Sequence, residues 1–423
     1  MRRWNFRHYA ISSCVTAALL AACGGSPPPI GAIRTLPQIA GTRPMDRASA
    51  SQYRVVFSFG SNAYGYDGIG PTAPLIYVEG ALYGTTFKGG ANGFGSDAYG
   101  TVFSVTRRGK ENVLHNFAAG PYDGATPYAG LVAINDTLYG TTYAGGHGYG
   151  VVFSITTAGD YHVLYNFTQS DGPPLGSLAD VNGMLYGTTP AGGVYGYGEV
   201  FSITPNGVEH VIYSFKGSSD GVSPTAGLLN VNGTLYGTTM SGGAYKKGTV
   251  FRISTTGAEK VLFSFDGPDG GGPAAPLIAA DGKLYGTTEY GGSARWGTVF
   301  SMSISGKKER VLHSFYNEPG DGVRPEAGVI DVNGKLYGTT AYGGTFSRSV
   351  CYGNGCGIIF SVTMTGKEHV LRRFDETDGA FPMANLIEVK GRLYGSTQAG
   401  GYSTPSCSFS APCYFGTVFE FKP

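Results

Sequence analysis

The sequence predicts an all-β fold, a seven-bladed β-propeller built from four-stranded antiparallel blades. One phrase recurs seven times along the 423 residues, as LYGTT in six copies and LYGST in the last. The leucines that open it are 56, 47, 50, 49, 52 and 57 residues apart, and a period near fifty is typical of propeller arrays. A part that recurs seven times specifies architecture, since a catalytic residue is needed only once. The leucines are Leu82, Leu138, Leu185, Leu235, Leu284, Leu336 and Leu393.

Each period contains four short runs rich in Val, Leu, Phe, Tyr and Thr, bounded by Gly, Asn, Asp or Pro, and this pattern indicates strands. Pairs such as Asn182-Gly183 and Asp281-Gly282 separate the first two runs. They supply the positive φ angles of a type I′ turn, so strands one and two are expected to form a hairpin. Short turns ending in glycine join strands three and four. A parallel β-helix is the rival fold, but hairpin turns of this kind disfavour it.

The count of segments predicts how the ring closes. Segments one to three occur seven times, but only six third-to-fourth turns exist, because the chain stops at GTVFEFKP. The missing fourth strand lies at the start, where YRVVFSF (53–59) precedes the first LYGTT. We therefore expect residues 52–423 to form one propeller of 28 short strands, in which 53–59 pairs beside 416–421.

The first 22 residues resemble a bacterial lipoprotein signal peptide. A basic start with Arg2, Arg3 and Arg7 precedes the apolar run AISSCVTAALL, and Leu20-Ala21-Ala22-Cys23 resembles a lipobox. An ordinary signal peptide with an incidental cysteine is the alternative. The apolar run is well short of the ~20 residues that cross a bilayer, so a transmembrane anchor is not favoured. We expect acylation of Cys23, a flexible tether over 23–51, attachment to a membrane through the lipid alone, and export to the outer membrane or cell surface.

Charge and cysteine content narrow the classes of function. Without Arg2, Arg3 and Arg7 the formal charge falls from +1 to −2, so no basic field is left to attract nucleic acid. Of six cysteines, four remain after Cys14 leaves with the signal and Cys23 is acylated. In an exported protein these are expected to form disulfides. Local bridges Cys351–Cys356 and Cys407–Cys413 are predicted, with cross-blade pairing as the alternative, and no metal or cofactor is expected.

LYGTT, the Gly-Gly that follows it, GTVFSIT and the VLHSF-type strand resemble the GloVer tandem repeat of choice-of-anchor bacterial surface proteins. They are more distantly similar to the kelch repeat. The resemblance covers about residues 52–423. It implies a propeller displayed at the cell surface and brings no established activity, so no catalytic residue follows from it. The recurrent Trp of the kelch outer strand is absent, with phenylalanines such as Phe117 nearby, so no kelch partner is inferred.

The second-to-third and inter-blade loops are expected to share one face of the ring, and binding is expected there. Aromatic and basic residues gather in these loops, a composition that suits the faces of sugars or a protein partner; packing of the loops by their own tyrosines is the alternative. The predicted ligand-binding residues are Phe94, Tyr99, His147, Tyr149, Tyr195, Tyr197, Tyr245, Lys246, Arg295, Trp296, Phe346 and Arg348.

An Asp-Gly step recurs between blades, at Asp67, Asp123, Asp171, Asp220, Asp269, Asp321 and Asp378. A ring of seven carboxylates suggests a cation site. The favoured interpretation is structural, with each side chain accepting backbone N–H groups in its turn, because no EF-hand spacing accompanies the aspartates.

Catalytic signals are weak. His115, His162, His210, His313 and His369 fall in fourth strands and are interpreted as equivalent packing residues, whereas His147 stands in a variable loop. The sequence GSSDG at 217–221 matches G-x-S-x-G without a following helix. Glu289 and Glu326 lie outside the repeat pattern on neighbouring blades and are the candidate acid/base pair.

We therefore expect a monomeric, membrane-anchored binding module for glycan or protein ligands. The alternative is a polysaccharide-active hydrolase or lyase that uses Glu289, Glu326 and His147.

Overall fold

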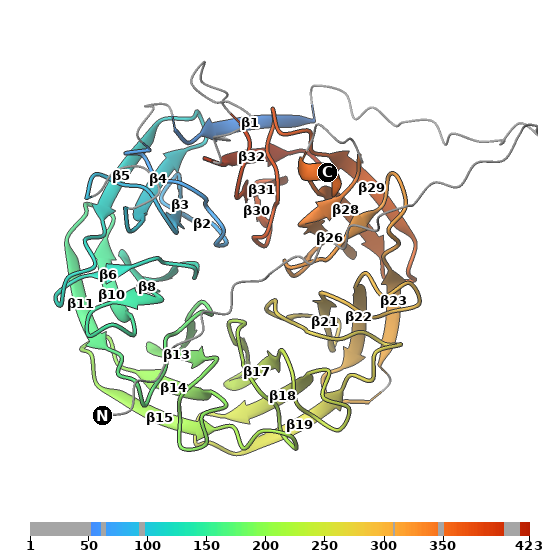
Figure 1. Cartoon of the computed structure of the whole chain (residues 1–423), viewed down its shortest axis with the longest axis horizontal. Coiled ribbons are helices and arrows are strands. Elements are labelled where there is room, and N and C mark those ends of the chain that lie inside the picture. The colour runs from blue at the N-terminus through green and yellow to red at the C-terminus, as the bar shows by residue number, and fades with distance from the viewer. Residues whose placement is uncertain (1–51, 61–64, 93–97, 308, 346–350, 402–414) are drawn as a thin grey trace, which may run out of the picture. The chain divides into compact units, whose positions relative to one another are not determined.

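The computed structural model describes residues 52–60, 65–92, 98–307, 309–345, 351–401 and 415–423. Seven four-stranded antiparallel sheets are arranged in a ring (Figure 1). The first strand of each sheet lies nearest the centre and the fourth lies outermost (Figure 1). The predicted fold class and the 28 strands of the blades are confirmed for these residues.

The first four blades follow one another along the chain, each with a three-residue first strand. Blade 1 comprises β2 (Ile76–Val78), β3 (Ala81–Thr86), β4 (Thr101–Thr106) and β5 (Glu111–Asn116). Blade 2 comprises β7 (Val132–Ile134), β8 (Thr137–Thr141), β10 (Val151–Thr156) and β11 (Tyr161–Asn166). Blade 3 comprises β12 (Ala179–Val181), β13 (Met184–Thr189), β14 (Glu199–Ile203) and β15 (Glu209–Ser214). Blade 4 comprises β16 (Leu229–Val231), β17 (Thr234–Thr239), β18 (Thr249–Ser254) and β19 (Glu259–Ser264).

The last three blades include the closure. Blade 5 comprises β20 (Ile278–Ala280), β21 (Lys283–Thr288), β22 (Thr298–Ser303) and β23 (Arg310–Ser314). Blade 6 comprises β25 (Ile330–Val332), β26 (Lys335–Thr340), β28 (Ile358–Thr363) and β29 (Glu368–Arg373). Blade 7 comprises β30 (Ile387–Val389), β31 (Arg392–Thr397), β32 (Thr417–Phe421) and the N-terminal β1 (Tyr53–Ser58). Strand β1 pairs antiparallel with β32, from Tyr53 opposite Phe421 to Ser58 opposite Thr417, which confirms the predicted closure (Figure 1).

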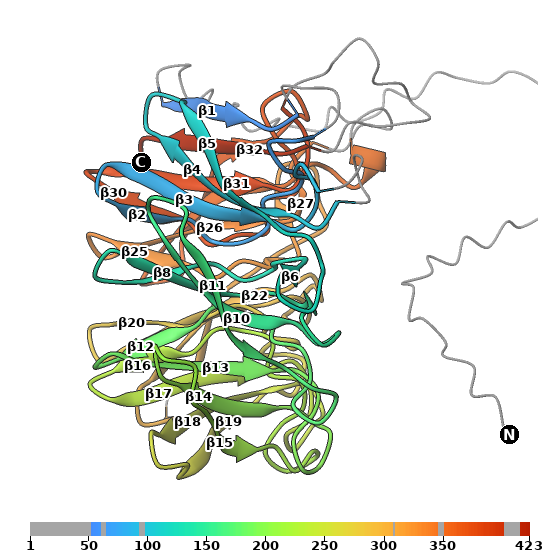
Figure 2. The same cartoon turned by 90° about the vertical axis from the view of Figure 1, so that its left-hand side faces the viewer.

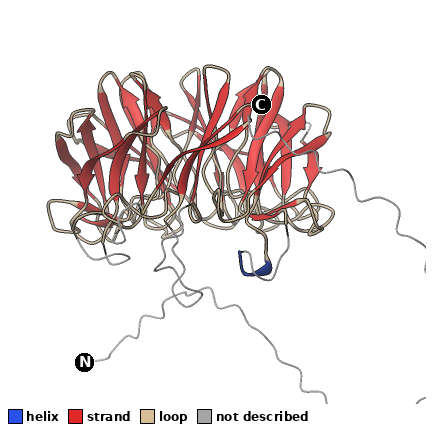
Figure 3. Ribbon diagram, turned by 90° about the horizontal axis from the view of Figure 1, so that it is seen from above, coloured by secondary structure: helices blue, strands red, loops and turns tan. Residues whose placement is uncertain are grey.

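Two short ladders were not predicted. β6 (Gly124–Ala125) pairs with β9 (Ala144–Gly145), and β24 (Gly322–Val323) pairs with β27 (Tyr342–Gly343). Each joins an inter-blade segment to the second-to-third loop of the next blade. In Figure 2 the labels β6 and β27 lie along the side of the ring that carries the longer loops. Figure 3 shows short hairpin turns along the opposite edge, as expected from the connectivity. We call these two sides the loop face and the hairpin face.

The LYGTT phrase recurs because each of its residues makes a different contact within or between blades. In blade 2, Leu138 packs against blade 1 and Tyr139 packs against blade 3, since alternate residues of a strand point to opposite faces. A Cβ on Gly140 would lie 2.5 Å from the ring of Phe153 on the next strand, so only glycine fits. The second threonine bonds its own loop, as Thr142 Oγ1 does to the carbonyl of Ala144 at 2.8 Å.

The first threonine of the phrase joins neighbouring blades. In five blades its hydroxyl, or that of the serine that replaces it, donates to a carbonyl just before the first strand of the next blade. These donors are Thr85, Thr188, Thr287, Thr339 and Ser396.

Every outer strand has a β-bulge at the same place. In blade 1 the register shifts between Val102 and Phe103, which leaves Leu114 of the outer strand without a partner residue. The carbonyl of Leu114 then faces the third-to-fourth turn of blade 2, where a Cβ on Gly159 would lie 3.2 Å from it. Gly159 has a φ of +100°, so the turn requires glycine. The bulge therefore fits one blade against the next.

The Asp-Gly aspartates have the structural role that was favoured. In all seven inter-blade turns the Asp carboxylate accepts the backbone N–H of the residue after the buried phenylalanine that ends the outer strand. In blade 3, for example, Lys216 N–H donates to Asp220 at 3.0 Å. Each carboxylate thus fixes the exit of the chain from its blade.

One predicted disulfide is confirmed. Cys351 and Cys356 are bonded within the second-to-third loop of blade 6, and Cys351–Gly353 forms a short 3-10 helix. Cys407 and Cys413 lie outside the described residues, so their local pairing stays a prediction.

Candidate functional site

Among the residues that the structure describes, the exposed aromatic side chains are confined to the loop face. Ten tyrosine or tryptophan side chains are exposed, and every one belongs to a second-to-third loop or to a segment between blades. The core, by contrast, buries the phenylalanine that ends each outer strand completely. Rings gathered on one face, rather than scattered over the surface, are typical of an interaction site. The ten are Tyr66, Tyr99, Tyr122, Tyr128, Tyr143, Tyr195, Tyr197, Tyr245, Trp296 and Tyr316.

Most of the residues predicted to bind ligand lie on this face and are accessible. Tyr149 is less accessible than the others, since its side chain is half-buried. Phe94, Phe346 and Arg348 lie outside the described residues. Tyr197 also covers Gly217 of the following inter-blade segment, where a Cβ would meet its ring at 2.8 Å. That ring therefore packs the loops as well as facing solvent. The other exposed members are Tyr99, His147, Tyr195, Tyr245, Lys246, Arg295 and Trp296.

The loop ends are tied to the following blade. The carbonyl of Trp296 accepts the backbone N–H of Arg324 at 3.0 Å, and the carbonyl of Tyr197 accepts that of Ser223 at the same distance. Arg324 and Ser223 have φ angles of 55° and 57°. The rings thus stand on a backbone that is hydrogen-bonded across each blade boundary, which reduces the entropy lost when a ligand orders them.

The candidate acid/base pair is brought together by an arginine between blades 5 and 6. Arg324 lies 3.3 Å from Glu289 and 3.2 Å from Glu326, so one guanidinium bridges both carboxylates. It also stands over the ring of Tyr342, 5.6 Å from the ring centre, and the ring of Phe381 lies 5.4 Å from Tyr342. We call these five residues the Arg324 cluster.

The cluster holds a carboxyl group that titrates near neutrality. Burial raises the pKa of Glu326 to about 7, Arg324 opposes this, and the charge of Glu289 adds to it. Burial also raises the pKa of Glu289, against the effect of Arg324. A group half-protonated near pH 7 can deliver or accept a proton. Both glutamates stand out in the sequence, whereas nothing in it marks Arg324 or Tyr342.

A second group on the loop face occupies the same repeat positions in blades 1 and 2. Phe87 and Tyr143 follow the LYGTT phrase, as Glu289 does, and Tyr128 follows a proline, as Glu326 does. The rings of Phe87 and Tyr128 are stacked at 5.5 Å, and that of Tyr143 meets Tyr128 edge-on at 5.9 Å. Equivalent positions are therefore aromatic on one side of the ring and charged on another. Alignment of the seven repeats at the residue after LYGTT would have identified these aromatic and charged positions from the sequence.

Acidic residues also meet at the boundaries between blades, and we call each such boundary a seam. The first residue of the outer strand in one blade, or in blade 5 the residue just before that strand, faces the Asp-Gly aspartate of the blade before it. In five seams that residue is a glutamate, and burial raises the pKa of four of these to about 7, with the facing Asp adding to the effect. The five are Glu111, Glu209, Glu259, Glu309 and Glu368.

The other two seams have tyrosine in place of glutamate and a basic partner for the aspartate. His115 contacts Asp123 at 3.0 Å and stacks on Tyr161 at 3.8 Å. Arg372 forms an ion pair with Asp378 and lies over the ring of Tyr53 at 4.4 Å. Each seam thus contains either a second carboxyl group or a tyrosine, and in the tyrosine seams a histidine or an arginine contacts the aspartate.

The interpretation of the five strand histidines as equivalent packing residues is wrong for three of them. His162, His210 and His369 are exposed, because they occupy the outward-facing position of the strand opposite a serine. His115 and His313 do lie in seams. The ligand atoms of His313, Asp321 and Glu368 are within 4.8 Å of one another. These three residues are of the types that hold a divalent cation, although Asp321 is engaged by the N–H groups of Tyr316 and Gly322.

Comparison with known proteins supports the family resemblance. The model of the Gloeobacter/Verrucomicrobia repeat matches residues 45–175 and 173–409. A search of curated proteins finds no relative of this chain.

No helix in the described residues is both long and apolar enough to pass through a bilayer.

Three solved structures illustrate the similar backbones. A candidate 6-phosphogluconolactonase from Bacteroides uniformis is 15% identical, with a TM-score of 0.49, and the match covers 75% of this chain and 88% of that one. A gluconolactonase from Xanthomonas campestris is 13% identical, with a TM-score of 0.38 and coverage of 64% and 79%. TolB from Acinetobacter baumannii is 12% identical, with a TM-score of 0.40 and coverage of 66% and 61%. At these identities and TM-scores the similarity carries no information on ligand or activity.

Proposed function

The chain belongs to the Gloeobacter/Verrucomicrobia repeat family, and we propose that it is a binding protein whose loop face takes up a glycan. The observation that carries this proposal is the confinement of all ten exposed aromatic side chains of the described residues to that face. Rigid rings cover the apolar face of a sugar at a small cost in side-chain entropy. The Arg324 cluster supplies charged groups next to them. A protein ligand is the other outcome that the experiment distinguishes.

The proposal includes attachment to a membrane at the cell surface. The sequence around Cys23 supports it, because a lipobox cysteine is acylated at its new N-terminus. A lipid on Cys23 would hold such a binding protein at the membrane surface without a transmembrane segment.

The binding experiment is a screen of residues 46–423 on glycan and protein arrays, followed by titration of the ligand found. Trp296→Ala and Tyr245→Ala each remove one exposed ring and are expected to weaken binding about tenfold or more, as for central aromatic contacts elsewhere. Circular dichroism should stay unchanged, because both side chains are on the surface. Tyr245 is preferred to Tyr197 because the latter also covers Gly217.

The matched control is Lys260→Ala, an exposed residue on the outer strand β19, away from the loop face. Its affinity should equal that of the unmodified protein. If both ring variants kept full affinity, the assignment of the face would be wrong. A ligand found only on the protein array would replace the glycan by a protein partner.

Cleavage of a polysaccharide is the second candidate, favoured by the shared guanidinium and the pKa of about 7 at Glu326. Glu326→Gln removes the titrating group and is expected to lower turnover by about a hundredfold or more. The measurement is release of reducing ends from the polysaccharide that binds. Turnover that is the same in Glu326→Gln and in the unmodified protein would exclude this mechanism, and binding without turnover would leave the protein a pure receptor.

A further inference from the structure

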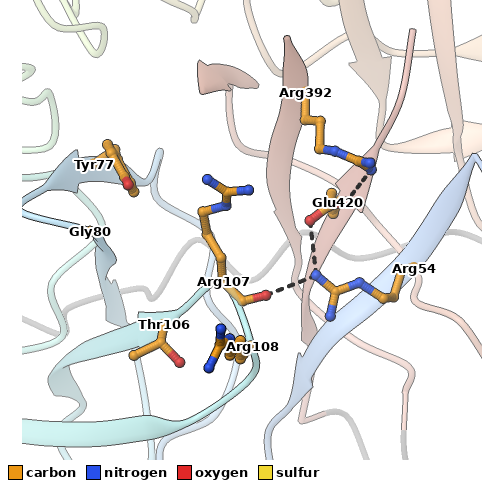
Figure 4. Close-up of a pocket in the computed structure, with 8 residues that line it drawn as sticks. All are labelled: Arg54, Tyr77, Gly80, Thr106, Arg107, Arg108, Arg392 and Glu420. Atoms are coloured by element: carbon orange, nitrogen blue, oxygen red, sulfur yellow. Dashed lines mark hydrogen bonds and ion pairs between the residues drawn. The ribbon is translucent and has the colours of Figure 1, made fainter. Parts of the chain in front are cut away.

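A cavity of about 500 Å³ opens on the hairpin face at the seam between blades 7 and 1 (Figure 4). It lies where the two ends of the propeller meet. Arg54 comes from the closing strand β1, Arg392 and Glu420 come from β31 and β32, and Arg107 and Arg108 come from the third-to-fourth turn of blade 1. Four guanidinium groups and one carboxylate thus line it, with the ring of Tyr77.

These charges depart from the repeat. The residue at the position of Glu420, opposite the LYG tyrosine, is serine in five other blades and arginine in one. The position of Arg107 holds Thr157, Pro205, Thr255, Ile304 or Met364 in the next five blades. A feature that only one of seven equivalent seams possesses is not required by the propeller itself.

Three of the charged residues of the cavity, Arg54, Arg392 and Glu420, have a structural role. The buried carboxylate of Glu420 accepts hydrogen bonds from Arg54 at 2.8 Å, from Arg392, and from the hydroxyl of Tyr394 at 2.8 Å. Arg54 also donates to the backbone carbonyl of Arg107 at 2.8 Å. This network ties the closing strand to blades 7 and 1. Glu420 is the single acidic residue of the cavity lining, and both of its carboxylate oxygens accept hydrogen bonds within this network.

Two guanidinium groups are not neutralised by this network, although that of Arg107 hydrogen-bonds the hydroxyls of Tyr77 and Tyr394. Neither Arg107 nor Arg108 forms an ion pair with a residue that the structure describes. The Nε atom of Arg107 is buried and has no hydrogen-bond acceptor among those residues. Figure 4 shows its guanidinium between Tyr77 of blade 1 and Glu420 of blade 7. A buried donor without an acceptor costs free energy, so this one is explained by a partner that brings oxygen atoms.

We propose that this cavity binds a small anion that carries a carboxylate or phosphate group, with Arg107 and Arg108 as its principal ligands. Four positive charges against one negative leave a net charge of +3 on the lining residues. Guanidinium groups match the paired oxygens of carboxylate and phosphate. The cavity volume lies within the range of about 300–1,000 Å³ that small-molecule sites occupy. Because residues from both ends of the propeller line the cavity, an anion bound there is expected to stabilise the closed ring.

The test is thermal unfolding and calorimetric titration of the full chain with inorganic phosphate and with citrate, at constant ionic strength set by sodium chloride. Either anion is expected to raise the melting temperature in a saturable manner. The two arms distinguish a phosphate site from a carboxylate site. Arg107→Gln should weaken binding by about tenfold or more, because hydrogen bonds to charged groups are lost.

Arg108→Gln provides a second variant if Arg107→Gln fails to fold, and it is expected to weaken the same binding. Arg252→Gln is the control, since Arg252 is an exposed arginine of β18 in another blade. Equal stabilisation by chloride, phosphate and citrate would overturn the proposal, because general screening acts on all surfaces. Unchanged affinity in both arginine variants would overturn it as well.

Discussion

Removal of residues 52–60 is expected to abolish the stable closed ring. Strand β1 covers the edge of β32, and an uncovered edge offers unpaired N–H and C=O groups to other chains. The deletion also removes Phe59, which is completely buried against Phe103 with ring centres 4.9 Å apart. Loss of one such phenylalanine costs about 3–5 kcal/mol, and whole domains are stable by only about 5–15 kcal/mol.

The measurement compares chains that begin at residue 46 and at residue 61. The longer chain should unfold in one cooperative transition and elute as a monomer. The shorter one should lose the transition or aggregate. A synthetic peptide of residues 52–60 is expected to restore the transition when added in excess, because it supplies the missing strand. Equal melting temperatures for the two chains would contradict the closure.

The closure could be predicted because it depends on counting. Seven LYG phrases, six third-to-fourth turns and one extra strand at the start have one consistent arrangement. The turn residues fixed the hairpins, since Asn182 and Gly183 adopt the positive φ angles, 53° and 84°, that the sequence suggested. The bulge in each outer strand could not be predicted. It inserts Leu114 and its equivalents without any change in composition.

The candidate site could be predicted only in part, because its contacts join different repeats. Glu289 and Glu326 stood out as departures from the repeat pattern. Arg324 did not stand out in the sequence, although its guanidinium contacts both glutamates. These contacts depend on how blade 6 packs on blade 5, which the sequence does not show. The strand histidines show the same limit. His115 and His162 are both histidines of outer strands, but one enters a seam and the other faces solvent.

The seams make the thermal stability depend on pH, with higher stability at pH 5.5 than at pH 8. Four seam glutamates have a pKa of about 7 in the folded protein, against an ordinary value of 4.5. Between these values the folded state retains protons that the unfolded state has released, so the free energy of unfolding falls as the pH rises. Glu199 adds to this, with a pKa of about 8. We expect the melting temperature to be roughly 5 °C higher at pH 5.5.

A buried histidine acts in the opposite direction. Burial lowers the pKa of His313 to about 4, so the unfolded state takes up a proton first as the pH falls below 6.5, and stability is lost between 6.5 and 4. The raised carboxyl groups outnumber this one histidine. The direction of the overall change is therefore set by the glutamates down to about pH 4.5, below which they are mostly protonated in both states.

A single substitution separates the effect of one seam glutamate on the melting temperature from the effects of the other titrating groups. Glu259→Gln mimics the protonated carboxyl opposite Asp220 and is expected to raise the melting temperature at both pH values, by roughly twice as much at pH 8 as at pH 5.5, because the unfolded glutamate is already largely ionised at pH 5.5. The control is Glu388→Gln, an exposed carboxyl of β30, which should change neither value. The measurement is differential scanning calorimetry of the three proteins at both pH values. A melting temperature of the unmodified protein that rises with pH, or an equal effect of both substitutions, would show that the seam carboxyls are ionised at little cost because water solvates them.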